Sequence, residues 1–179
     1  MMDNFREESV GHRNSFLYDL LYILAWVVIV VFGIVAVTLL QMTVFALNFH
    51  IPLIIVMLIT GAIAVLLFLR KDRLKTEYEY TFTNGELDLA MVFRNSSRKE
   101  LGSMRIKNVE ACGHVAHESF KRYLSMPNIK KSNWFANRDG NLFYFYFSKD
   151  NQKRLIIIEP TEEMVEMIRM YCAQGAYQG

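Results

Sequence analysis

The sequence predicts an α-helical transmembrane hairpin followed by an α+β domain, in which several antiparallel strands are closed by one C-terminal helix. Three patterns lead to this fold class. Two long apolar blocks fill residues 20–69, apolar and polar residues alternate from Thr76 onward, and an amphipathic helical pattern ends the chain. With 179 residues, the chain has room for the hairpin and one compact domain of roughly 100 residues.

The two apolar blocks, residues 20–40 and 51–69, contain no charged residue. A helix needs about 20 apolar residues to cross the hydrocarbon core of a bilayer, and both blocks have that length. They are apolar on every face, whereas a soluble helix has one apolar stripe. We therefore expect two transmembrane helices joined by a tight connection through residues 41–50, with Pro52 in the first turn of the second helix.

The basic residues predict the orientation of the hairpin. Arg6 and Arg13 precede the first block, four basic residues follow the second, and residues 46–50 between the blocks have no Lys or Arg. The positive-inside rule then places both termini in the cytoplasm, with the hairpin in the cell membrane. Neither span holds an ionisable residue, which argues against an ion pathway and favours an anchor. The expected membrane-interface residues are Arg70, Lys71, Arg73 and Lys75.

Composition divides the chain into four segments. Residues 1–19 form a polar, partly acidic cytoplasmic segment, which favours a retained anchor over a cleaved signal peptide. Residues 20–69 form the hairpin, residues 70–75 a basic juxtamembrane linker, and residues 76–179 the cytoplasmic domain. The net charge is only +2, so no strong field attracts nucleic acid, and no nucleic-acid partner is expected.

The domain begins with a predicted β-hairpin. Tyr78, Tyr80 and Phe82 alternate with polar residues, as in a strand with one buried face. The dipeptide Asn84-Gly85 follows, and it favours a type I′ turn because both positions of that turn need a positive φ. Alternation then resumes through residue 93. Residues 98–104 predict a third strand that is interrupted at Gly102.

The middle of the domain is less regular. Residues 104–116 predict a strand that ends, turns and resumes, with Met104, Ile106 and Val109 at the turn. Residues 117–125 predict a short helix with Phe120, Tyr123 and Leu124 facing inward. Residues 127–140 look like a loop.

The last part of the domain predicts two strands and a helix. Residues 142–147 are apolar on both faces, as in a central, covered strand. A further strand is expected over residues 154–158. Thr161 then caps an amphipathic helix whose first turn is acidic, and Gly175 would end that helix.

This order of elements resembles the bacterial pleckstrin-homology-like (PH-like) domains carried on a two-helix membrane anchor, including the YcxB-like group. The resemblance rests on YEYTFTNGELDLAMVF, the MRIKNV turn, the strands NLFYFYF and KRLIIIE, and the closing TEEMVEMIRMY. It implies a strongly bent antiparallel sheet that forms a partly open barrel capped by the C-terminal helix. Residues 117–139 are long for this family. The members are mostly uncharacterised, and a fold alone does not transfer a function.

One basic and aromatic tract is the candidate contact surface. Lysines near a membrane attract anionic lipid head groups by about 1 kcal/mol each, and tryptophan suits an interface. The tract would then contact lipid head groups or a protein partner; the alternative is a solvated loop whose aromatic residues pack on the domain. Its members are Lys121, Arg122, Lys130, Lys131, Trp134, Phe135 and Arg138.

No residue set predicts a metal site, a cofactor or a reaction. Cys112, His114 and His117 have the spacing C-x-H-x-x-H, but a structural zinc site needs four ligands and no fourth is near. Cys112 and Cys172 form no C-x-x-C motif, so they are interpreted as buried thiols without a disulfide framework. Catalytic motifs such as G-x-S-x-G, H-E-x-x-H and phosphate-binding loops are absent from the sequence, so an enzyme is not expected.

Two function classes follow. The first is an integral membrane protein that presents a cytoplasmic binding or scaffolding domain to a protein partner or to the membrane surface, with a sheet edge or the groove beside the last helix as the docking place for a peptide. The second is an accessory subunit of a larger membrane transport or secretion complex, which acts through small residues of the hairpin. Those residues are Gly33, Ala36, Gly61 and Ala64.

Overall fold

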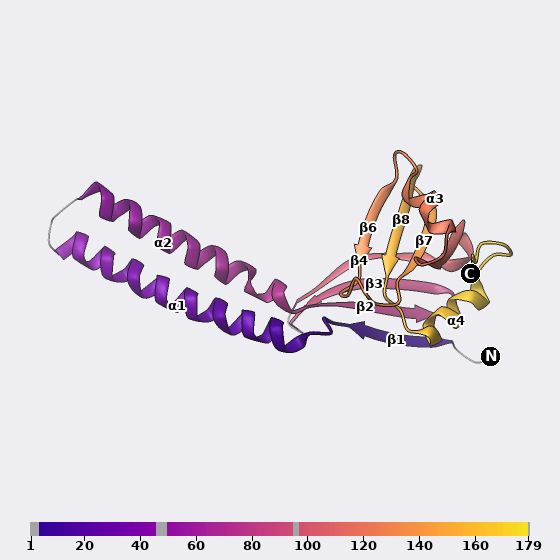
Figure 1. The fold of residues 1–179 in the computed structure, drawn as a ribbon, viewed down its shortest axis with the longest axis horizontal. Coiled ribbons are helices and arrows are strands. Elements are labelled where there is room, and N and C mark those ends of the chain that lie inside the picture. Colours follow the sequence, from indigo (N-terminus) through magenta and orange to yellow (C-terminus); the bar gives the residue numbers. More distant parts are fainter. Residues whose placement is uncertain (1–3, 46–49, 95–96, 179) are drawn as a thin grey trace. The chain divides into compact units, whose positions relative to one another are not determined.

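The computed structural model describes residues 4–45, 50–94 and 97–178. They form two compact units (Figure 1). One is a helical hairpin of residues 14–75. The other, called the β domain here, combines the N-terminal residues up to Arg13 with the residues from Thr76 onward.

The hairpin consists of α1 (Ser15–Phe45), α2 (Ile51–Arg70) and the short 3₁₀ helix η1 (Lys71–Lys75). Both predicted helices are confirmed, and both are long and apolar enough to cross a bilayer. The first helix is longer at both ends than predicted, because residues 41–45 continue it instead of forming a connection. A continuous helix pairs its own backbone groups, which is required in lipid. Residues 46–49 of the expected connection lie outside the described residues.

Small residues pack the two helices of the hairpin against each other. A Cβ atom at Gly61 would lie 3.9 Å from the Cβ atom of Ala36, and Ala64 is buried. By contrast, a Cβ atom at Gly33 would have nothing within 4 Å among the described residues. Three of the four small residues are therefore already used inside this chain.

Lys71 and Lys75, both predicted interface cations, have partners within the hairpin. The ammonium group of Lys71 lies 3.1 Å from a carboxylate oxygen of Asp72 and over the rings of Trp26 and Phe68, at 5.1 and 4.7 Å from their centroids. Lys75 pairs with the carboxylate of Asp19 and lies over the ring of Tyr22. A membrane-interface role for Arg70, Lys71, Arg73 and Lys75 stays a prediction.

The first sheet of the β domain has the order β1-β2-β3-β4, all antiparallel. The predicted hairpin is confirmed: Asn84 and Gly85 have φ values of 48° and 89°. The predicted interruption is present as well, because the register of β3 against β4 shifts beside Gly102. The strands are β1 (Phe5–Val10), β2 (Thr76–Thr83), β3 (Glu86–Phe93) and β4 (Ser97–Arg105).

Strand β1 was not expected, and it changes the division of the chain. It pairs with β2 from Phe5 opposite Thr83 to Val10 opposite Tyr78. Its sequence, FREESV, gives no apolar alternation, because the buried side chain at its centre is Glu8. The β domain therefore begins before the hairpin, whereas the sequence places residues 1–19 in a separate segment.

The second sheet has the order β5-β7-β8-β6, in which β6 runs parallel to β8. The aromatic strand β7 is central, as predicted, and its residues 143–147 are all buried. The prediction that residues 127–140 are a loop is wrong in part, since they contain β6. That strand reads KKSNW, without apolar alternation, because it is an edge strand with charged residues toward water. The strands are β5 (Ala111–His114), β6 (Lys130–Trp134), β7 (Phe143–Lys149) and β8 (Gln152–Ile158).

Strand β7 is apolar on both faces because it borders two hydrophobic clusters. Phe143, Phe145 and Phe147 belong to the main core, which also contains residues of the first sheet and of α4 (Glu162–Tyr171). Tyr144 and Tyr146 belong to a second cluster on the other face, under α3 (Ser119–Leu124). The two sheets do not close into a full barrel, which agrees with the partly open form expected from the resemblance.

The short helices differ from the predictions in detail. In α3 (Ser119–Leu124), Phe120 and Tyr123 are buried as predicted, but Leu124 is 42% exposed. One face of a single-turn helix holds positions three apart, and the next residue is rotated by about 100° toward water. The 3₁₀ helix η2 (Ile106–Asn108) forms the predicted turn after β4.

The final helix, α4, has the predicted N-terminal cap but ends earlier than predicted. The side chain of Thr161 caps α4 by accepting a hydrogen bond from the backbone N–H of Met164, as predicted. The helix ends at Tyr171, earlier than Gly175, which has φ of 81° in the following turn.

A buried tyrosine connects the two sheets. The hydroxyl of Tyr80 in β2 donates a hydrogen bond to the backbone carbonyl of Trp134 at 2.5 Å and accepts one from the N–H of Glu159 at 3.3 Å. The Tyr80 side chain is fully buried, and this burial raises the pKa of its phenol. The neutral phenol is therefore the form that joins β2 to the ends of β6 and β8.

Candidate binding groove

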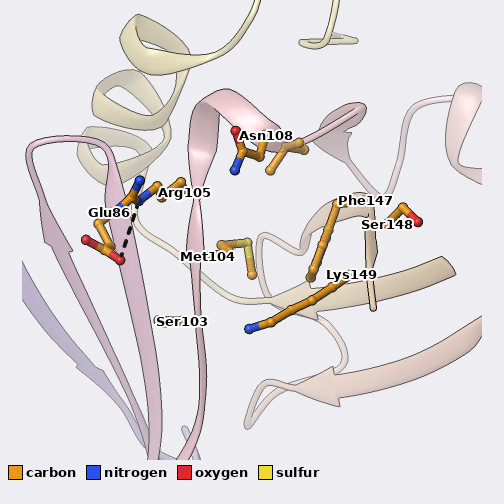
Figure 2. Close-up of a pocket in the computed structure, with 9 residues that line it drawn as sticks. Glu86, Ser103, Met104, Arg105, Asn108, Phe147, Ser148 and Lys149 are labelled. Atoms are coloured by element: carbon orange, nitrogen blue, oxygen red, sulfur yellow. Dashed lines mark ion pairs between the residues drawn. The ribbon is translucent and has the colours of Figure 1, made fainter. Parts of the chain in front are cut away.

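Two adjoining cavities lie at the end of the first sheet that carries the β2–β3 turn. Their volumes are about 260 and 430 Å³, and both are lined by Glu86 and Arg105. We call them together the turn-end groove. The first cavity is lined by Glu86, Ser103, Met104, Arg105, Asn108, Val109, Phe147, Ser148 and Lys149 (Figure 2). The second is lined by Thr83, Asn84, Gly85, Glu86, Arg105, Lys107 and Tyr171.

The β3–β4 register places the charged residues of the groove. Arg105, the last residue of β4, lies opposite Glu86, the first residue of β3. Arg105 Nε is 4.0 Å from Glu86 Oε1, and both side chains are about half exposed or more. An exposed pair at this distance contributes only about 0–1 kcal/mol. Arg105 can therefore exchange Glu86 for an anionic ligand at little cost.

The turn itself is held rigidly. The N–H of Ile106 donates a hydrogen bond to the carbonyl of Gly85 at 2.9 Å, which joins the start of η2 to the type I′ turn. Lys107 follows directly, on the exposed side of η2. The groove thus has a fixed backbone frame with cationic side chains at its rim.

The floor of the first cavity is apolar and its rim is polar. Met104, Val109 and Phe147 are buried, while Ser103 and Ser148 are exposed. Figure 2 shows the side chain of Lys149 extending from the end of β7 toward β4. An apolar floor with a few polar groups at the rim is typical of a ligand site.

Two strand edges flank the groove. Strand β4 is an edge strand of its sheet. Strand β5 pairs with β7 only over residues 143–146, so residues 147–149 of β7 extend beyond it. Free strand edges can accept an added strand through backbone hydrogen bonds. The groove therefore has the geometry to receive an extended peptide.

The charge of the groove is positive. It contains three cations, Arg105, Lys107 and Lys149, against the single carboxylate of Glu86. Lys107 and Lys149 have no ion-pair partner among the described residues, so their charges are available to a ligand. The hydroxyls of Ser103 and Ser148 and the amide of Asn108 add hydrogen-bond donors for carboxylate oxygens.

Tyr171 at the end of α4 forms one wall of the second cavity. Its ring packs edge-on against Phe82 with centroids 5.4 Å apart, and its hydroxyl accepts a hydrogen bond from the amide of Asn4 at 3.0 Å. A Cβ atom at Gly85 would come within 2.5 Å of the Tyr171 ring, so this close approach requires glycine. The groove thus combines a sheet edge with the side of the last helix, the two docking places that the sequence suggests.

The predicted basic and aromatic tract lies elsewhere, on separate elements. Lys121 and Arg122 are exposed on α3, Lys130 and Lys131 are exposed on β6, and Arg138 is exposed in the following loop. Trp134 and Phe135 are partly buried and pack against the main core and the second cluster, respectively. None of the seven lines the turn-end groove. Contact of this tract with lipid or with a partner stays a prediction.

The residues of the C-x-H-x-x-H spacing have separate partners. His114 Nδ1 lies 3.0 Å from Asn141 Oδ1, and His117 Nδ1 lies 2.8 Å from the hydroxyl of Ser119. Cys112 instead contacts Cys172. In the part of the chain that the structure describes, no three His, Cys, Asp or Glu residues are grouped to hold a metal ion.

The groove was not found from the sequence. Arg105, Lys107 and Lys149 look like scattered surface cations, because β7 is distant in the sequence from β4 and η2. The only local signal at this place is the Asn84-Gly85 turn, which marks one end of a sheet. It does not indicate that Lys149 reaches the same end.

A comparison with protein-family models agrees with this architecture. The model described as "Bacterial PH-like domain (DUF6106)" matches residues 2–178. The chain belongs to this family. The match includes β1, the helical hairpin and the whole sheet region, so the resemblance to anchored bacterial PH-like domains is confirmed. Comparisons with curated proteins and with solved structures find no match. PH-like domains are typically binding modules rather than enzymes. The turn-end groove is therefore considered as a candidate binding site.

Proposed function

We propose that this protein is a membrane-anchored PH-like binding module whose turn-end groove holds an acidic, extended segment of a protein partner. The observation that carries the proposal is the cluster of Arg105, Lys107 and Lys149 between two strand edges. Backbone hydrogen bonds to an edge supply affinity for an extended chain, and side-chain charges select which chain binds. An acidic segment satisfies both features.

Within the β domain, the groove and the connections to the hairpin lie at opposite ends of the β1–β2 pair. Both connections to the hairpin, after Arg13 and before Thr76, leave from the end of the β1–β2 pair where Val10 lies opposite Tyr78. Thr83 and the groove lie at the other end of β2. Five residues of strand separate Tyr78 from Thr83, which corresponds to about 17 Å. The groove is therefore remote from the points at which the β domain is tethered.

The same pairing supports the expected topology. Because β1 and β2 are neighbours in one sheet, the segments before and after the hairpin lie together. Two helices return a chain to its starting side, and the positive-inside rule then favours the cytoplasm for that side. We propose that the β domain and both termini are cytoplasmic, where the partner would be an intracellular protein or the cytoplasmic segment of a membrane protein.

A defined acidic peptide tests the proposed groove. The full-length protein in nanodiscs of neutral lipid is titrated with fluorescent polyglutamate, and binding is followed by anisotropy at low and at high salt. The variant R105E/K149E should weaken binding by about 10-fold or more, since each close charge contributes on the order of 1 kcal/mol. The matched variant K130E/K131E reverses two exposed cations on β6, outside the groove, and should leave binding unchanged.

Two results would contradict this assignment. Equal affinity of wild type and R105E/K149E would remove the groove from the function. A loss of binding in K130E/K131E would move the site to the predicted basic and aromatic tract. Nanodiscs that contain phosphatidylserine provide a further arm: if anionic lipid abolishes peptide binding to the wild type, the membrane surface itself competes for the cations.

The hairpin-based alternative, an accessory subunit of a larger membrane transport or secretion complex, retains one specific observation. Gly33 has no described side chain near it, whereas Ala36, Gly61 and Ala64 already serve the packing within the hairpin. If α1 docks on another membrane protein through Gly33, Gly33→Leu should abolish crosslinking of that protein in native membranes. Gly61→Ala, a smaller change inside the hairpin, serves as the control. Unchanged crosslinking of Gly33→Leu would count against this alternative.

A further inference from the structure

The two cysteines of this chain lie next to each other in the β domain. Cys112 is in β5 and Cys172 directly follows α4, so they are 60 residues apart in the sequence. Their Sγ atoms are 3.2 Å apart. The chain contains only two cysteines, so the fold brings together the only pair of thiols that it has.

The backbone at both cysteines is held in place. Cys112 donates its N–H to the carbonyl of Ala176 and accepts a hydrogen bond from the N–H of Gln178, each at 2.8 Å. The tail that follows Cys172 therefore runs alongside β5. A Cβ atom at Gly113 would lie only 2.2 Å from the Gln178 carbonyl oxygen, so glycine is required for this close approach. The contact between the sulfurs thus comes from a fixed arrangement of α4, the tail and β5.

We propose that Cys112 and Cys172 form a reversible disulfide that joins the end of α4 to β5. The sulfurs of a disulfide are about 2.05 Å apart, so closing the present separation requires a movement of only about 1 Å. Because one thiol already contacts the other, small adjustments of the two side chains are sufficient. The disulfide therefore forms within one chain and requires no third thiol.

The oxidant in this proposal is a low-molecular-weight disulfide such as oxidised glutathione. The Cys172 thiolate attacks one of its sulfurs, and one glutathione thiolate leaves and takes up a proton. Cys112 then loses its proton and attacks the Cys172 sulfur of the mixed disulfide, which releases the second glutathione. Two protein thiols are oxidised by two electrons in total, and one glutathione disulfide is reduced to two thiols.

The exposure of the two thiols and the hydrogen bond between them indicate which cysteine reacts first. The side chain of Cys112 is fully buried, whereas Cys172 is partly exposed and can meet a dissolved disulfide first. The hydrogen bond from the Cys112 thiol lowers the pKa of Cys172, because it stabilises the thiolate. The same hydrogen bond, together with burial, raises the pKa of Cys112. Cys172 is therefore the attacking thiol and Cys112 the resolving thiol.

The disulfide would act on the groove through one neighbouring residue. Tyr171, which precedes Cys172, forms a wall of the turn-end groove. Tying Cys172 to β5 would fix the position of that wall. The disulfide itself does not depend on peptide binding, so it can be tested and can fail without affecting the proposed function.

The test uses purified full-length protein in detergent. The reduced protein is incubated with oxidised glutathione, and intact mass and peptic peptides are measured without a reducing agent. We expect the loss of two hydrogens, a linked peptide pair that contains Cys112 and Cys172, and recovery of the starting mass with dithiothreitol. The melting temperature of the oxidised form should rise by about 10 °C or more, since the bond closes a long loop.

Single-cysteine variants separate the two roles. In C112S, a stable glutathione adduct should remain on Cys172, because the resolving thiol is absent. In C172S, the buried Cys112 should stay unmodified in the folded protein. The proposal is overturned if wild-type protein forms only stable glutathione adducts, only intermolecular dimers, or no oxidised product. The wild-type measurement decides this even if a variant fails to fold.

Discussion

Removing residues 14–75 and joining Arg13 to Thr76 through a short glycine-rich turn is expected to give a soluble, folded β domain. Strands β1 and β2 are antiparallel neighbours, with Val10 opposite Tyr78 at the end where the chain leaves for the hairpin. A short turn can therefore replace the whole hairpin without changing the register. Size-exclusion chromatography and thermal unfolding followed by circular dichroism measure the outcome.

The matched variant begins at Thr76 and lacks β1. It exposes the edge of β2 and loses the contact between Glu8 and the start of α4. We expect a loss of at least about 3 kcal/mol in the free energy of unfolding, from several hydrogen bonds of about 1 kcal/mol each. That is a large share of the stability of a small domain. Equal melting temperatures for the two variants would show that β1 is dispensable.

Glu8→Ala is expected to be the most destabilising single substitution in β1. The Glu8 carboxylate is only 7% exposed. It accepts hydrogen bonds from the N–H of Thr161 at 3.0 Å, from the Thr161 hydroxyl and from Nε of Arg6 at 2.5 Å. It also places a negative charge at the N-terminus of α4, where the helix dipole favours it. Removing it leaves the N–H of Thr161 without its acceptor, at a cost of about 2–4 kcal/mol.

The neighbouring residue Glu7 provides the control, because it has the same side chain in the same strand but is exposed. Glu7→Ala should change the free energy of unfolding by no more than about 0.5 kcal/mol. Urea unfolding of the full chain, monitored by the fluorescence of its tryptophans, gives both values. Similar effects of the two substitutions would mean that the contact between Glu8 and Thr161 does not stabilise the domain.

The predictions that succeeded depend on signals within a few neighbouring residues. The apolar length of α1 and α2, the alternation of Tyr78, Tyr80 and Phe82, and the Asn84-Gly85 turn each determine a local structure directly. The cap at Thr161 belongs to the same class. The doubly apolar strand β7 was recognisable as central, because only a strand covered on both faces can bury every side chain.

The elements that were missed are polar edge strands. β1 pairs with β2 and β6 pairs with β8, but neither has an apolar alternation that would reveal it. The one buried side chain at the centre of β1 is a carboxylate, which a pattern of hydrophobic residues cannot detect. An edge strand is stabilised mainly by backbone hydrogen bonds to its neighbour, and these leave little trace in composition.

The sequence by itself determined the apolar helical pair, the β-hairpin, the aromatic strand and the capped final helix, because each depends on spacing within one segment. The tertiary structure alone decided that residues before the hairpin join the sheet after it, that Lys149 lies with Arg105 and Lys107, and that Cys112 contacts Cys172. These juxtapositions arise from pairing and packing between segments distant in the chain. Such long-range neighbours follow from the assembled fold and are not encoded in any local pattern.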